Sequence, residues 1–135
     1  MRSWVTALLL AFSAHAACRA DPRSPFESEL ARLAGRTAKQ CGLVSLRHTS
    51  AAEWQCAVDA ERERLPFWFA VQGQGEDSEV WTAAIRTPNG EHVVLDYDSN
   101  MAGGKGLNPH FHQTLCPGMI EYLPTEVPPF RCKRV

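Results

Sequence analysis

The sequence predicts a small α+β domain in which two N-terminal helices pack on one face of an antiparallel meander of three to five strands, with disulfide bonds stapling the fold. Three observations support this class: two capped helical segments between residues 24 and 66, a two-residue hydrophobic period from Phe67 onward, and four cysteines inside the domain. With 135 residues, 44% of them hydrophobic, the chain is long enough for one domain with its own core.

Both helices are predicted from the residues that open them. Ser24 can cap the first helix, and Glu27 completes a capping box three residues later. In the same way, Ser50 and Glu53 predict the start of a second helix, which Pro66 ends.

Strands are predicted after the second helix, where the residue pattern changes from a helical period to a period of two. They cover residues 67–72, 78–87, 91–98 and 110–115, and a further short strand or extended segment covers residues 42–46. The Asn89-Gly90 pair predicts a two-residue type I′ turn, which would place Ala84 opposite Leu95. Four prolines predict a mostly irregular C-terminal segment.

The predicted register gathers aromatic and acidic side chains on one face of the meander: Trp68, Trp81, Asp96 and Asp98. Tryptophan offers a large contact area and carboxylates fix orientation, so this combination is typical of a recognition surface. Alternatively, the proline-rich C-terminal segment covers the two tryptophans.

Residues 1–20 have the pattern of a secretory signal peptide. Arg2 precedes an apolar stretch at residues 4–12 that is too short to span a bilayer, and small residues allow cleavage after Ala16, Ala17 or Ala20. Residues 21–135 would then form the single domain, in an extracytoplasmic space where disulfides are stable.

The five cysteines divide into one at the signal boundary and four in the domain. The sequence-local pairing joins Cys41 to Cys56 and Cys116 to Cys132, although four cysteines allow three pairings. Each bond would close a loop of about 15 residues and stabilise the fold by about 3 kcal/mol. Cys18 is either lipidated, which would anchor a lipoprotein to the membrane, or removed with the signal, which would release a periplasmic or secreted protein.

His110 and His112 lie two residues apart on a predicted strand, so both imidazoles would point to one side. Such a pair can bind a metal if His92, Asp96 or Asp98 supplies a third ligand.

Charge and motif content exclude several classes of function. The net charge of −1, evenly mixed along the chain, argues against a nucleic-acid partner, and the alternating charges of residues 61–64 predict a solvated helix face. No nucleophile motif or cofactor fingerprint identifies a reaction. We therefore expect a non-catalytic exported module that binds an envelope protein or a small ligand, with extracytoplasmic metal binding through His110 and His112 as the alternative.

Overall fold

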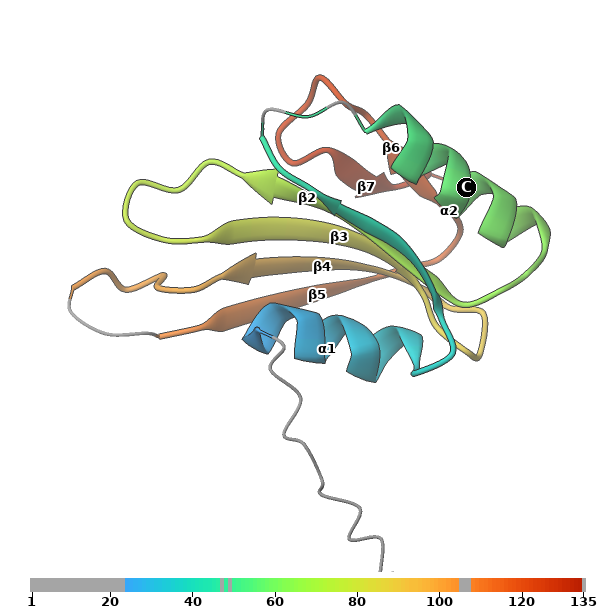
Figure 1. Cartoon of the computed structure of the whole chain (residues 1–135), viewed down its shortest axis with the longest axis horizontal. Coiled ribbons are helices and arrows are strands. Elements are labelled where there is room, and N and C mark those ends of the chain that lie inside the picture. Colours follow the sequence, from blue (N-terminus) through green and yellow to red (C-terminus); the bar gives the residue numbers. More distant parts are fainter. Residues whose placement is uncertain (1–23, 47, 49, 105–107, 135) are drawn as a thin grey trace, which may run out of the picture.

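The computed structural model describes residues 24–46, 48, 50–104 and 108–134. The predicted signal peptide and Cys18 lie outside these residues. The elements follow one another as α1 (Pro25–Ala34), β1 (Lys39–Val44), α2 (Ala51–Arg62), β2 (Phe67–Gly73), β3 (Val80–Arg86), β4 (His92–Asp98), β5 (His110–Cys116), β6 (Ile120–Tyr122) and β7 (Phe130–Cys132) (Figure 1). Among them, no helix is long and apolar enough to cross a membrane.

Five strands form one mixed sheet in the order β1-β2-β3-β4-β5, and β6 pairs with β7 in a separate hairpin. The meander from β2 to β5 is antiparallel, as predicted. The prediction of a purely antiparallel sheet is wrong, because β1 runs parallel to β2. A parallel pair needs a crossover connection, and α2 provides it.

The two helices do not form an N-terminal pair, because β1 lies between them in the chain. They also pack on opposite faces of the sheet, which we call the α1 face and the α2 face. Neighbouring residues of β2 show this: Trp68 belongs to the cluster under α1, and Phe67 and Phe69 belong to the cluster under α2. Successive strand residues point to opposite faces, so both faces are covered by packed side chains.

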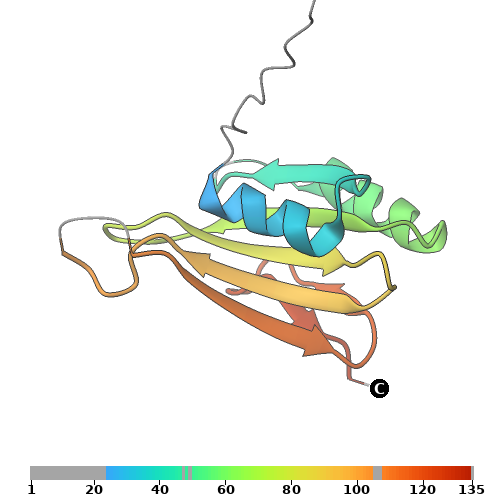
Figure 2. The ribbon, with the colours of Figure 1, turned by 90° about the horizontal axis from the view of Figure 1, so that it is seen from below.

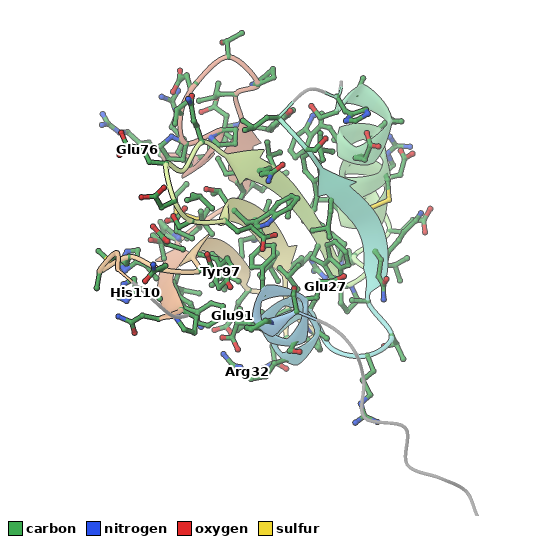
Figure 3. All side chains as sticks on the ribbon, turned by 60° about the vertical axis from the view of Figure 1, so that its left-hand side comes forward. Glu27, Arg32, Glu76, Glu91, Tyr97 and His110 are labelled. Carbon is green, nitrogen blue, oxygen red and sulfur yellow. A yellow bond between two sulfur atoms is a disulfide. The ribbon has the colours of Figure 1, made fainter. Side chains whose placement is uncertain are left out.

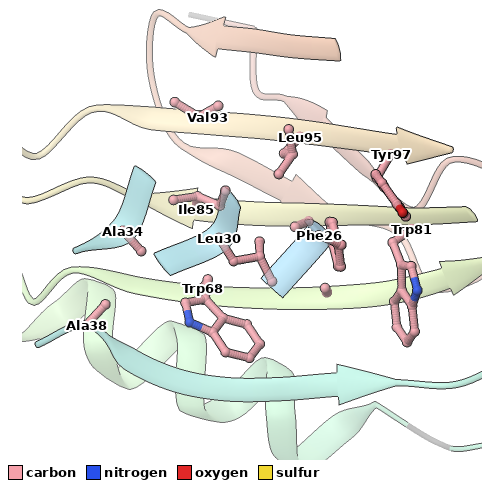
Figure 4. Packing of buried hydrophobic residues seen from close by; sticks show 12 residues of the cluster. Phe26, Leu30, Ala34, Ala38, Trp68, Trp81, Ile85, Val93, Leu95 and Tyr97 are labelled. Atoms are coloured by element: carbon pink, nitrogen blue, oxygen red, sulfur yellow. The ribbon is translucent and has the colours of Figure 1, made fainter. Parts of the chain in front are cut away.

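Helix α1 begins with the predicted capping box. The Ser24 hydroxyl accepts a hydrogen bond from the Glu27 backbone N–H, and the Glu27 carboxylate accepts one from the Ser24 backbone N–H. One stripe of the helix, made of Phe26, Leu30 and Ala34, is fully buried on the sheet. Figure 2 shows α1 running along the sheet, and Figure 4 shows this stripe against the side chains of β2, β3 and β4.

The turn between β3 and β4 differs from the predicted type I′ turn. Gly90 N–H donates to the Thr87 carbonyl, and Thr87 N–H donates to the Glu91 carbonyl, so the loop has three residues and Thr87 faces Glu91. Proline suits the second position of a type I turn, which Pro88 occupies, and Gly90 follows with a φ of 83°. The register therefore moves by one residue, and Ala84 pairs with Val94 instead of Leu95.

The C-terminal segment is more regular than predicted. The β6-β7 hairpin packs on the α2 face, where Tyr122 and Phe130 contact Phe69 with ring centroids 5.4 and 5.2 Å apart. The Ser50 hydroxyl is hydrogen-bonded to the Tyr122 hydroxyl. It makes no capping bond to α2, so the predicted second capping box is absent.

Both predicted disulfides are present. Cys41–Cys56 joins β1 to α2, and Cys116–Cys132 joins the end of β5 to β7. The two bonds are compatible with an extracytoplasmic protein.

Candidate functional site

The two tryptophans of the predicted recognition surface are buried. Trp68 is 9% exposed and Trp81 is 7% exposed, because α1 covers them. The Trp81 ring lies 5.7 Å from the Phe26 ring, and its indole N–H donates to Glu79. The covering element is thus the first helix and not the C-terminal segment.

Asp96 and Asp98 lie on the opposite face of the sheet from the tryptophans, because of the shifted β3-β4 register. Each carboxylate accepts a hydrogen bond from another residue of the chain. Asp96 accepts a hydrogen bond from the Thr82 hydroxyl at 2.9 Å, and Asp98 accepts one from the Asn100 backbone at 2.8 Å. The structure therefore does not bring the four residues together on one surface.

His110 and His112 are exposed on β5, an edge strand, and Figure 3 shows His110 at the periphery of the molecule. They stand opposite Asp98 and Asp96 on β4. Within the described part of the chain, no group of three or more histidine, cysteine or acidic side chains is arranged to hold a metal ion. Metal binding by the histidine pair stays a prediction, which zinc titration of the protein and of the His110→Ala/His112→Ala variant tests.

A pocket of about 410 Å³ lies between α2, the sheet and the β6-β7 hairpin. Volumes of this size are typical of small-molecule sites. Most of its lining is apolar: one wall comes from α2, the floor from the central strands and the other wall from the segment leading into β6. The residues in these positions are Trp54, Ala57, Val58, Phe67, Ala84, Met119 and Ile120.

The polar part of the lining is made by Glu61, Arg62 and His92. His92 Nε2 lies 2.8 Å from Glu61 Oε2, and both side chains are largely shielded from solvent. Arg86, the cross-strand neighbour of His92, approaches the other carboxylate oxygen, with its Nε 3.5 Å from Glu61 Oε1. That Nε is buried without a hydrogen bond, so the ion pair alone compensates for its burial.

The C-terminal end of α2 holds the side chains of Glu61, His92 and Arg86 in place. Leu65 N–H donates to the Ala60 carbonyl and Arg64 N–H to the Glu61 carbonyl, which is the Schellman pattern of a helix C-terminus. Arg64 occupies the left-handed position of that motif, with a φ of 57°. Its carbonyl then accepts a hydrogen bond from Arg86 at 2.7 Å, so the helix end and β3 are joined beside the pocket.

The contact between Glu61 and His92 determines what the imidazole can offer. An ionised carboxylate only accepts hydrogen bonds, so in the neutral ring the proton sits on Nε2 and Nδ1 is an acceptor. Within the described residues Nδ1 has no hydrogen-bond partner. The pocket thus has apolar walls and, among its lining residues, His92, whose Nδ1 in the neutral ring can accept a hydrogen bond from a hydroxyl or an N–H.

This site was not predicted from the sequence. The alternating charges around Glu61 predicted a solvated helix face instead. The better signal is helical spacing: Glu61 lies three, four and seven residues after Val58, Ala57 and Trp54, so it belongs to the stripe that faces the sheet.

Comparisons of the chain with protein-family models, curated proteins and solved structures give no match.

Proposed function

We propose that the protein is an exported binding module that holds a small, mainly apolar molecule in the pocket between α2 and the sheet. The observation that carries this proposal is an apolar pocket of about 410 Å³ with one polar pair, Glu61 and His92, in its wall. Pockets that bind small ligands commonly combine apolar walls with a few placed polar groups.

The lining supports binding over nucleophilic catalysis. Among the described residues that line the pocket, none is a serine, threonine or cysteine that His92 could activate. Burial of apolar ligand surface supplies the affinity, at roughly 25 cal/mol per Å² before the costs of association are subtracted.

A polar group that donates a hydrogen bond complements Nδ1 of the neutral His92 imidazole. An aliphatic alcohol complements this nitrogen better than a fatty acid does, since a carboxylate would face an acceptor nitrogen and the Glu61 carboxylate beside it, and Arg62, the cation of the lining, is already paired with Asp59. One well-placed hydrogen bond is worth about 1 kcal/mol, so at neutral pH the alcohol should bind about five- to tenfold more tightly than the acid.

Dye displacement tests the pocket. N-phenyl-1-naphthylamine should fluoresce on binding, and 1-decanol should displace it at lower concentration than decanoate. Val58→Phe fills the pocket from the α2 wall and should weaken dye binding at least about tenfold. Gln55→Phe, on the exposed side of the same helix, should leave it unchanged. Equal affinity of both variants and the native protein would remove the proposal.

Export is the second part of the proposal, supported by the two disulfides and by the signal-like pattern of residues 1–20. The intact mass of the mature protein tests it. We expect loss of the first 16, 17 or 20 residues and four oxidised inner cysteines, and the mass also reports whether Cys18 is acylated. A product that retains Met1 with free thiols would contradict export.

A further inference from the structure

The two edges of the sheet differ in how well they are protected against pairing with another strand. An open edge presents unpaired backbone N–H and C=O groups, and natural proteins usually block it with lysine, proline, a bulge or a covering segment. The β1 edge carries Lys39 and an irregularity between Gln40 and Gly42. Gly42 has a φ of 127°, which departs from regular strand geometry.

Strand β5 has none of these devices. Its seven residues contain no proline and no lysine, arginine, aspartate or glutamate. Its register with β4 is unbroken from His110 to Cys116. Within the described residues, no backbone hydrogen bond outside the sheet ladder involves β5. Its outer edge is therefore a regular template for strand addition, without lysine, arginine or carboxylate side chains.

We propose that β5 pairs with β5 of a second copy of this chain, so that two five-stranded sheets join into one across a two-fold axis. The partner strand runs antiparallel, and the axis passes through Gln113, which faces Gln113 of the partner subunit. Phe111 then stands opposite the partner's Leu115, and His112 opposite the partner's Thr114.

The side chains of β5 favour this register over its neighbours. Leu115 is 62% exposed, and Phe111 on the same face packs against Tyr97 with ring centroids 5.0 Å apart. Centring the axis on Gln113 covers each exposed leucine with an aromatic ring, and apolar pairs of this kind stabilise antiparallel strands. Moving the axis to His112 leaves Leu115 without a partner on the strand, and moving it to Thr114 does the same to Phe111.

The strand that pairs with β5 comes from a second copy of the chain because β5 is self-complementary. All seven residues pair when the axis lies at Gln113, and two symmetry-related Phe–Leu contacts form from one sequence. Two paired strands alone bury less area than a standard stable interface, so the dimer should be concentration-dependent.

Sedimentation velocity of the oxidised mature protein over a concentration series tests the dimer. Gln113→Lys places two lysines opposite each other across the axis, and should weaken association at least about tenfold. The substitution spares the fold, because the Gln113 side chain is exposed and its one hydrogen bond, to Glu29, is a surface contact. The control is Gln40→Lys, the same change at an exposed position of the β1 edge, which should dimerise like the native protein.

Disulfide cross-linking tests the register independently of affinity. In a Cys18→Ser background, the two cysteines of the Gln113→Cys variant face each other across the proposed axis. Their Cα atoms then lie within the 4.4–6.8 Å range of a disulfide, so the variant should give a cross-linked dimer. In the Leu115→Cys variant the two thiols lie about 13 Å apart along the strands and should cross-link about tenfold more slowly. A native protein that stays monomeric at every concentration, or equal cross-linking of the two variants, overturns the proposal; the first result would leave the edge to a strand of a different protein.

Discussion

Replacing Phe26 with alanine tests whether α1 closes one face of the sheet. Phe26 is 2% exposed, and its ring stacks on Trp81 and Tyr97 with centroid distances of 5.7 and 5.2 Å. Its removal deletes the side chain that joins the start of α1 to β3 and β4. The tryptophans that the sequence placed on a recognition surface are buried largely by this helix.

The expected loss of stability for Phe26→Ala is about 4 kcal/mol. Burial of a phenylalanine side chain is worth about 1.5–3 kcal/mol, and the cavity left behind raises the measured cost of a buried Phe→Ala change to about 3–5 kcal/mol. Two aromatic contacts favour the upper half of that range, and the position in the first helical turn favours the lower half, because the helix end can relax.

Urea denaturation followed by tryptophan fluorescence measures this change. With an m-value of about 2 kcal/mol/M, the midpoint should fall by about 2 M. Ser28→Ala, at an exposed position of the same helix, should shift stability by less than about 0.5 kcal/mol. If Phe26→Ala behaves like Ser28→Ala, then α1 does not hold the sheet, and Trp68 and Trp81 are available to a partner after all.

Three further predictions concern single contacts. Arg64→Gly should stabilise the protein by about 0.5–1 kcal/mol, because a non-glycine residue in the left-handed region is strained, and Arg62→Gly should destabilise it in the same urea assay. Burial, with Glu79 and Asp98 nearby, raises the pKa of Tyr97 above its usual 10.0, so the contribution of this phenol to folding stability is fully present below pH 10 and falls as the pH rises further; the difference between the ultraviolet titrations of the native protein and of Tyr97→Phe should show the Tyr97 phenol ionising above pH 10. Removing the Cys116–Cys132 bond with a double serine variant should cost about 3 kcal/mol and weaken dye binding, whereas retained affinity would show that the β6-β7 hairpin does not shape the pocket.

Local signals predicted the elements and the disulfides well. The capping box at Ser24, the alternation from Phe67 onward and the spacing of Cys41 and Cys56 each depend on residues close in sequence, and each matches the structure. The arrangement of these elements was harder to predict. Periodicity shows that a helix has an apolar stripe, but not which face of the sheet it covers, so α1 and α2 were placed together.

The side chains of β4 were assigned to the wrong faces of the sheet for a single local reason. Asn-Gly pairs favour two-residue turns, but Pro88 fixes its own φ in the range of a type I turn and so favours the three-residue loop. A one-residue change of register sends every side chain of the strand to the other face. This turn moved Asp96 and Asp98 away from Trp68 and Trp81; the two tryptophans share a face, as predicted, but α1 covers it.

The disulfides are connected to the proposed binding function through the walls of the pocket. Cys56 lies on α2 between Trp54 and Ala57, and its bond to Cys41 ties that wall to the edge of the sheet. The opposite wall, Met119 and Ile120, lies between Cys116 and β7 and is tied by the second bond. The floor, by contrast, consists of sheet residues held by ladder hydrogen bonds. Because a small domain has little apolar area to spare, walls that leave a pocket open need support from outside the core, and the disulfides supply it. An oxidising compartment, in which the two disulfides are stable, therefore suits the proposed binding site as well as the fold.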